Sequence, residues 1–112
     1  MNFLRIVAKT DIGLKRSSNQ DSYAAGELPG SVAWAVVCDG MGGAAGGNIA
    51  SSTAVKLISE RICASYRDGM SSNSIRNMLV SAITAANISV YDMSVANSDL
   101  AEMGTTVVAA LI

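Results

Sequence analysis

An aspartate between an apolar run and a group of glycines is the feature of this sequence best suited to chemistry. The run covers residues 32–38, Asp39 follows it directly, and glycines recur from Gly40 to Gly47. Because the run is apolar at every position, it predicts a strand buried on both faces, which would hold Asp39 with little freedom to move. The glycines expose peptide groups, and a helical pattern begins near Ile49. Together these features predict a site for a metal ion, a phosphate or both.

A second polar stretch lies upstream, in residues 14–23, LKRSSNQDSY. In one interpretation it is a solvated loop between two strands, because Asn and Asp are common turn residues. In the other, the Arg16 guanidinium binds a phosphate through two parallel hydrogen bonds and Asp21 faces a metal ion. The residue types alone leave both interpretations open.

Length, charge and cysteine content limit the class of protein. The 112 residues, half of them hydrophobic and without a repeat or linker, predict one domain spanning residues 1–112. A net charge of −1, with both signs spread along the chain, gives no indication of nucleic acid or an anionic membrane as partner. No apolar run is long enough to span a bilayer and no signal-peptide pattern begins the chain, so we expect a cytoplasmic protein. In that compartment Cys38 and Cys63 would be reduced core residues. The chain has no histidine, which excludes His-based catalysis and His-ligated zinc.

The spacing of apolar residues predicts strands and helices along the whole chain. We expect strands at residues 3–9, 23–25, 31–39 and 107–112, and helices at residues 47–66 and 75–95. Only a short turn separates the two middle strands, so they should pair antiparallel. We therefore expect an antiparallel sheet covered by helices.

The strand at residues 107–112 is apolar throughout and is expected to be buried on both faces. The chain stops on this strand, with no turn and no further strand after it. We therefore expect the chain to be part of a longer domain, and the edge of this strand to promote self-association between copies.

Three blocks of residues together resemble a known family. They are TDIG at residues 10–13 with Arg16 and NQDS at residues 19–22, CDGMGG at residues 38–43 with Gly47, and MGTTVV at residues 103–108. In this order and spacing they are similar to the metal-dependent protein serine/threonine phosphatases of the PPM class (protein phosphatase 2C type), in their compact bacterial form. The resemblance implies an α/β fold of the α+β type, with two antiparallel β-sheets flanked by helices in an α-β-β-α sandwich, of which the N-terminal half is present.

The same resemblance implies roles for four residues. Asp39 would bridge two Mn²⁺ or Mg²⁺ ions, the Gly40 carbonyl would bind one of them, and Asp21 would hold the metal site directly or through water. Arg16 would bind the substrate phosphate. Hard cations prefer such oxygen ligands. The implied reaction is hydrolysis of phosphoserine and phosphothreonine in proteins by a metal-activated water, without a covalent enzyme intermediate. The implied partners are phosphorylated proteins and a cognate serine/threonine kinase.

The sequence departs from the family pattern at several positions. Ala44 stands where members often carry a histidine proposed as general acid, and Gln20 stands where many have glutamate. The later aspartates that complete the second metal site in the family have no match, because Asp68, Asp92 and Asp99 are expected to be solvated. We therefore expect the chain by itself to bind Mn²⁺ or Mg²⁺ weakly and to have little or no phosphatase activity.

Two other functions fit part of the pattern. Residues 40–45, GMGGAA, match the glycine spacing of a dinucleotide-binding loop. Glu60 lies about twenty residues after Gly40, the spacing at which such proteins carry an acid that binds ribose. In that pattern the acid ends a second strand, whereas Glu60 lies within a helical stretch, and Asp39 would repel a pyrophosphate. The second alternative is a catalytically incomplete fragment, or a degenerate relative, that acts as a binding or regulatory module.

Overall fold

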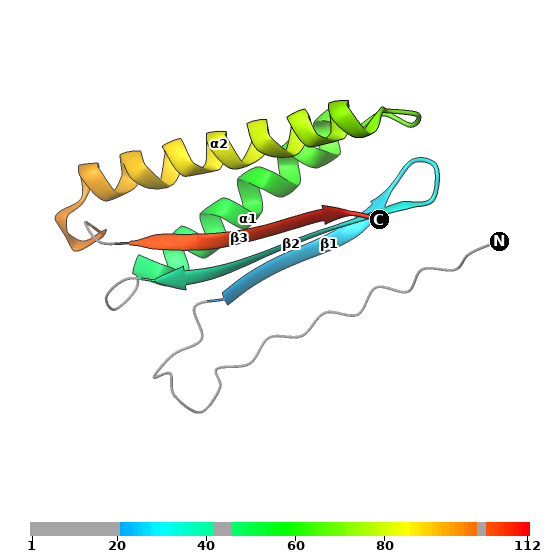
Figure 1. Cartoon of the computed structure of the whole chain (residues 1–112). Helices are drawn as coiled ribbons and strands as arrows, with labels where there is room; N and C mark the ends of the chain where they lie inside the picture. The colour runs from blue at the N-terminus through cyan, green and yellow to red at the C-terminus, as the bar shows by residue number, and fades with distance from the viewer. Residues whose placement is uncertain (1–20, 42–45, 101–102) are drawn as a thin grey trace.

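Two helices pack on one face of a three-stranded antiparallel sheet (Figure 1). The computed structural model describes residues 21–41, 46–100 and 103–112. Within them the elements are, in order, β1 (Asp21–Leu28), β2 (Val32–Met41), α1 (Gly46–Ser65), α2 (Ser72–Ala96), the short 3₁₀ helix η1 (Ser98–Leu100) and β3 (Gly104–Leu111). The predicted α+β class with an antiparallel sheet and a helical layer is confirmed. The strand predicted at residues 3–9 lies outside the described residues.

β1 and β2 form a hairpin, as the short turn between them predicts. In that turn Gly30 and Ser31 have positive φ values of 80° and 61°, a region that glycine enters without steric cost. β1 begins at Asp21 rather than at residue 23, because its first two residues pair with the end of β2. The polar start of β1 has no apolar alternation, so the sequence pattern could not predict this part of the strand.

β3 pairs antiparallel with β2, so β2 lies between the other two strands. The pairing runs from Met41 opposite Gly104 to Trp34 opposite Leu111. Two further backbone hydrogen bonds join Ala33 and Ile112, with N···O distances of 3.1 and 2.8 Å. Among the described strands β3 is an outer one, in keeping with the predicted exposed edge.

Both helices lie close to their predicted ranges. Ser71 is the N-cap of α2, and its hydroxyl accepts a hydrogen bond from the Ser74 N–H at 3.1 Å. This bond satisfies one of the N–H groups that a helix start leaves without an intrahelical acceptor. Asn97 caps the other end of α2. Between the helices Gly69 has a φ of 83°, in the left-handed region that glycine enters without steric cost.

The hydrophobic core lies between the helices and one face of the sheet. Val36 and Cys38 of β2 and Ile58 and Ile62 of α1 have no exposed surface in this core. Residues of α2, among them Met78, complete the cluster. The apolar residues whose spacing predicted the two helices therefore also form core contacts.

The opposite face of the sheet is open in the described part of the chain. Val37 of β2 is 50% exposed and Val108 of β3 is 67% exposed. The prediction that both strands are buried on both faces is therefore wrong for the described residues, because the two helices cover the same face. The predicted burial of both cysteines is also wrong for one of them. Cys38 is buried, whereas Cys63 is exposed on α1, and both thiols are free.

α2 is long and apolar enough to cross a membrane by length and composition, with a mean hydropathy of 1.3 over its most apolar window. Polar residues interrupt α2, so it contains no unbroken apolar run of that length. Met78, Ala82 and Ala86 of this helix pack in the core cluster that contains α1 and the sheet. This packing gives the apolar residues of α2 a role within the domain.

Candidate metal centre

The β1–β2 hairpin places two predicted metal ligands opposite each other. Asp21 and Asp39 are register partners in the antiparallel pair. Side chains at such positions point to the same face, with Cβ atoms about 5 Å apart. Two like charges at this spacing repel each other, and a cation held between them would offset that repulsion. The hairpin thus brings together two acids that are distant from each other in the sequence.

The carboxylate pair lies on the sheet face that the helices leave open. Cys38, the residue before Asp39, is buried against the helices. Ser22, the residue after Asp21, forms a hydrogen bond with Ser51 of α1, with 2.9 Å between the two Oγ atoms. Because successive side chains of a strand alternate between faces, Asp21 and Asp39 point away from the helices. Both are half-buried, so a ligand can reach them.

β3 contributes a third side chain to this row. Thr106 is the register partner of Asp39, and its Oγ1 accepts a hydrogen bond from the Asp39 N–H at 3.3 Å. The same hydroxyl lies 3.5 Å from the Asp39 carbonyl oxygen. From the other face of β3, the Thr105 hydroxyl donates to the Asp39 carbonyl at 3.2 Å. In the sequence both threonines belong only to the MGTTVV block, because their contact with Asp39 depends on strand pairing.

The other predicted site residues divide into described and undescribed positions. Gly40 is buried directly after Asp39 in β2, and the role of its carbonyl as a metal ligand stays a prediction. Arg16, Gln20 and Ala44 lie outside the described residues, so their roles stay predictions. Among the acids expected to be solvated, those at positions 68 and 92 are indeed exposed.

The candidate ligands are of the type that a hard divalent cation prefers, but they are few among the described residues. Asp21, Asp39 and the Gly40 carbonyl are the oxygen donors that Mg²⁺ and Mn²⁺ prefer, and water can complete the coordination of Mg²⁺. Within residues 21–41, 46–100 and 103–112, no three side chains of His, Cys, Asp or Glu form a group that could hold a metal ion. A site built from the described residues alone would therefore bind a cation weakly.

The thiol next to the carboxylate pair does not add a soft ligand to it. Burial raises the pKa of Cys38, and a hydrogen bond with Thr105 opposes this rise. The thiol therefore stays protonated near neutral pH, and it faces the helices rather than the carboxylates. The chemistry of the site is that of oxygen ligands.

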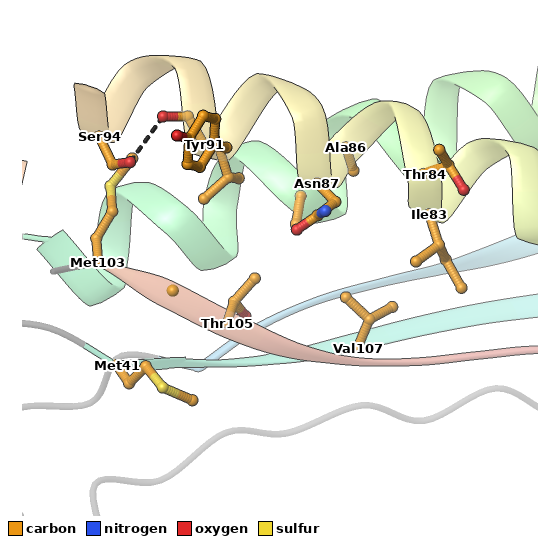
Figure 2. A pocket seen from close by; sticks show the side chains of 13 residues that line it. Met41, Ile83, Thr84, Ala86, Asn87, Tyr91, Ser94, Met103, Thr105 and Val107 are labelled. Carbon is orange, nitrogen blue, oxygen red and sulfur yellow. Dashed lines mark hydrogen bonds between the residues drawn. The ribbon is translucent and has the colours of Figure 1, made fainter. Parts of the chain in front are cut away.

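A cavity of about 600 Å³ lies between α2 and β3 (Figure 2). Figure 2 shows Thr105 and Val107 rising from β3 toward α2, with Asn87 and Tyr91 on the helix above them. No side chain in the lining is charged. The cavity is on the helix side of the sheet, whereas Asp21 and Asp39 lie on the other side, so it is separate from the candidate metal centre.

The protein phosphatase 2C family model matches residues 14–112. The chain belongs to this family, and the resemblance noted in the sequence is confirmed. A protein of Streptococcus pyogenes, described as of protein phosphatase 2C type, is 36% identical over 105 residues, which cover 93% of this chain and 41% of that protein. The serine/threonine protein phosphatase PstP of Mycobacterium tuberculosis is 33% identical over 108 residues, covering 96% of this chain and 19% of its own.

Solved structures of serine/threonine phosphatases share the fold of this chain. The serine/threonine phosphatase of S. agalactiae superposes with a TM-score of 0.81 at 34% identity, over 93% of this chain and 42% of that chain. PstP of M. tuberculosis superposes with a TM-score of 0.75 at 30% identity, over 93% of this chain and 40% of that chain. The chain thus has the fold of part of these phosphatases and spans about two fifths of the length of each solved relative.

Proposed function

We propose that the chain takes part in metal-dependent hydrolysis of phosphoserine and phosphothreonine in proteins. The observation that carries this proposal is the position of Asp39 opposite Asp21 on the open face of the sheet. Membership of the protein phosphatase 2C family supports it. So do the names of relatives in Listeria monocytogenes and M. tuberculosis, which are serine/threonine phosphatases.

In this proposal the chain's own residues hold two Mn²⁺ or Mg²⁺ ions and orient the substrate. Asp39 would bridge the two ions, the Gly40 carbonyl would bind one of them, and Asp21 would hold the site directly or through water. Bound divalent cations lower the pKa of a coordinated water and stabilise negative charge on a phosphoryl group. Arg16 binds the substrate phosphate through paired hydrogen bonds. Ala44 cannot donate a proton, so either water protonates the leaving alcohol or turnover is slower.

A second candidate function follows from the small donor set of the described residues. The chain would then be a catalytically incomplete fragment or a degenerate relative that acts as a binding or regulatory module. The match covers 41% of the S. pyogenes relative. Under both proposals we expect the chain alone to bind Mn²⁺ or Mg²⁺ weakly and to have little or no phosphatase activity.

The substitution Asp39→Asn tests the catalytic proposal, with Asp92→Asn as a matched control on the exposed side of α2. The full-length context is a chimera in which this chain replaces the matching segment of the S. pyogenes relative. The assay is Mn²⁺-dependent release of phosphate from a phosphothreonine peptide. Loss of the bridging charge should lower kcat/KM by more than about 100-fold, the upper end of the loss for residues that only support a metal ligand. Asp92→Asn should keep the parent rate.

Two results would contradict the catalytic proposal in different ways. Near-normal Mn²⁺-dependent turnover by Asp39→Asn would remove Asp39 from the metal site. A folded chimera that binds Mn²⁺ but never turns over would favour the binding-module candidate.

The role of Arg16 has its own test in the same chimera. If Arg16 binds only the phosphate, Arg16→Ala should raise KM by about tenfold or more and lower kcat as well if the contact tightens in the transition state. Mn²⁺ affinity, measured by isothermal titration calorimetry, should change little. A variant that loses Mn²⁺ binding while keeping its KM would show that the assigned role is wrong.

The remaining proposals concern partners and location. The substrates are phosphorylated proteins, a cognate serine/threonine kinase supplies them, and the reaction takes place in the cytoplasm. We also propose that copies of the chain self-associate along β3, because the uncharged strand has an outer edge among the described strands and an exposed Val108. Co-purification with a kinase, cell fractionation and light scattering over a range of concentrations test these three points. The three points would be contradicted, in turn, if no kinase co-purifies, if the protein is recovered in the membrane fraction, or if it is a monomer at all concentrations.

A further inference from the structure

The outer edge of β3 carries main-chain groups that no described strand pairs. Ala33 and Ile112 exchange both of their backbone hydrogen bonds, so they form a hydrogen-bonded pair of the β2–β3 ladder. Such pairs recur at every second residue of an antiparallel ladder, and the register of β3 continues without a break. The even-numbered residues of β3 therefore bond to β2. The N–H and C=O groups that point away from β2, toward the side without a described strand, belong to Thr105, Val107, Ala109 and Leu111.

The cavity between α2 and β3 adjoins two of these residues, on the helix side of the sheet (Figure 2). Thr105 and Val107 line it from β3, and Asn87 and Tyr91 line it from α2. Paired residues of neighbouring strands point their side chains to the same face. Side chains of a strand added opposite Thr105 and Val107 would therefore point into this cavity. Its volume of about 600 Å³ is within the range that accommodates a drug-sized ligand, so it has room for such side chains.

We propose that the outer edge of β3 and the facing side of α2 form a groove that binds one extended strand of a partner polypeptide. The backbone of the partner would bond to the outward N–H and C=O groups of β3, and its alternate side chains would fill the cavity. In this mode of recognition the main-chain hydrogen bonds provide affinity and the side-chain pocket provides selectivity.

The charge of the groove restricts the chemistry of the partner strand. β3 has no charged residue, and no charged side chain lines the cavity. A charge buried there would have no counter-charge, which is costly. The partner strand therefore carries uncharged, mainly apolar side chains at the alternate positions that face α2.

A single strand suits this groove better than a second copy of the chain does. Two copies that paired their β3 edges about a two-fold axis would bring both α2 helices to the same face of the joined sheet. A single strand brings no second helix to that face. Because copies are also proposed to associate along β3, the partner strand should compete with that association. The groove is separate from the candidate metal centre, since Asp39 lies on the other face of the sheet.

The probe for this groove is a fluorescein-labelled peptide of about nine residues, the length of a long strand, with valine alternating with threonine. Fluorescence anisotropy should show saturable binding to the chain, with a dissociation constant on the order of 100 μM or tighter. The control peptide is N-methylated at its valines, which removes the N–H groups of the residues whose side chains would face α2. It should bind at least about tenfold more weakly, because several hydrogen bonds are lost.

Two substitutions in the chain test the backbone contact and the cavity separately. Ala109→Pro removes one outward N–H at a place where an outer strand tolerates proline, and it should weaken binding about three- to tenfold. Ala109→Ser keeps that N–H and should bind like the parent. Asn87→Asp places a charge in the cavity wall and should weaken binding about tenfold, whereas Asn77→Asp, on an exposed position of α2, should not. Urea midpoints of all four variants check that the fold is kept.

Amide exchange by nuclear magnetic resonance locates the bound peptide. The amides of Val107 and Ala109 point outward and should exchange more slowly when the peptide binds. Those of Thr106 and Val108 already bond to β2 and should change little. This alternation is specific to an added strand, since binding elsewhere on the chain would not slow every second amide of β3.

The inference is overturned if the parent chain shows no saturable binding, or if the N-methylated peptide binds as well as the plain one. It is also overturned if raising the chain concentration alone slows exchange at Val107 and Ala109, because a second copy would then be the occupant. None of these results bears on the metal site, which Asp39→Asn tests independently on the opposite face of the sheet.

Discussion

The two faces of the β-sheet differ in what covers them and in what their side chains can do. On one face Val36 and Cys38 are buried under the helices. On the other, Val37 is half exposed and Asp39 lies opposite Asp21. These four residues of β2 are consecutive in the chain. The alternation of the strand alone therefore separates the residues that stabilise the fold from those that could bind a ligand.

From this separation we expect that the fold does not depend on the candidate metal centre. The covered face buries apolar side chains, which is the main source of stability in a small domain. The open face carries the acids, which the core does not need. Substitutions on the two faces should therefore have separable effects on stability and on binding, and the following predictions test that separation.

The largest difference is expected between two adjacent valines. Val36 has no exposed surface and Val37 is 50% exposed. Val36→Ala should lower the free energy of unfolding by about 2–3 kcal/mol, because it removes buried methyl groups and leaves a cavity. Val37→Ala should cost less than about 1 kcal/mol. Urea denaturation of both variants checks this, and equal losses would mean that the two faces are equally packed in solution.

A charge on the open face should act on association rather than on folding. Val108 is 67% exposed on β3, so Val108→Lys should change the free energy of unfolding by no more than about 0.5 kcal/mol. It should raise the dissociation constant for self-association by about tenfold, because a charged side chain on an outer strand opposes pairing. Light scattering over a range of concentrations measures this constant. Asn77→Lys, on an exposed position of α2, is the control and should leave association unchanged.

The smallest effect concerns the hydrogen bond that ties the start of β1 to α1. The Ser51 hydroxyl is buried and bonds to Ser22 at 2.9 Å, whereas Ser52 is exposed on the same helix. Ser51→Ala should cost about 1 kcal/mol relative to Ser52→Ala, because both variants gain the same helix propensity and only one loses the bond to β1. Thermal unfolding of the pair measures the difference. Equal stabilities would show that this bond contributes nothing to holding β1.

The sequence predicted most of the secondary structure but not how the elements cover each other. The ranges of α1 and α2 and the antiparallel hairpin follow from local spacing and from the short turn, and all are confirmed. The predicted double burial of β2 and β3 is wrong for the described residues. An unbroken apolar run is compatible with a strand that is buried on both faces. The placement of the helices decides whether both faces are covered.

The cysteines show the same limit at the level of single residues. Cys38 is buried because it lies on the sheet face that the helices cover, whereas Val37 in the same apolar run is half exposed. Cys63 lies in a helix, where burial depends on which side of the helix meets the sheet. A small apolar side chain near the end of α1 fits either side, so its exposure could not be read from residue type.

For the candidate metal centre, the sequence by itself determined the chemical types and the position of one candidate ligand. Asp39 stands between an apolar strand and glycines, and this arrangement is entirely local. The tertiary structure decided that Asp21, Asp39 and Thr106 form one row across three strands. Register joins residues that are distant in the chain, and a shift of one residue would send each side chain to the opposite face. Local patterns carry no information about that shift, so the row exists only in the folded sheet.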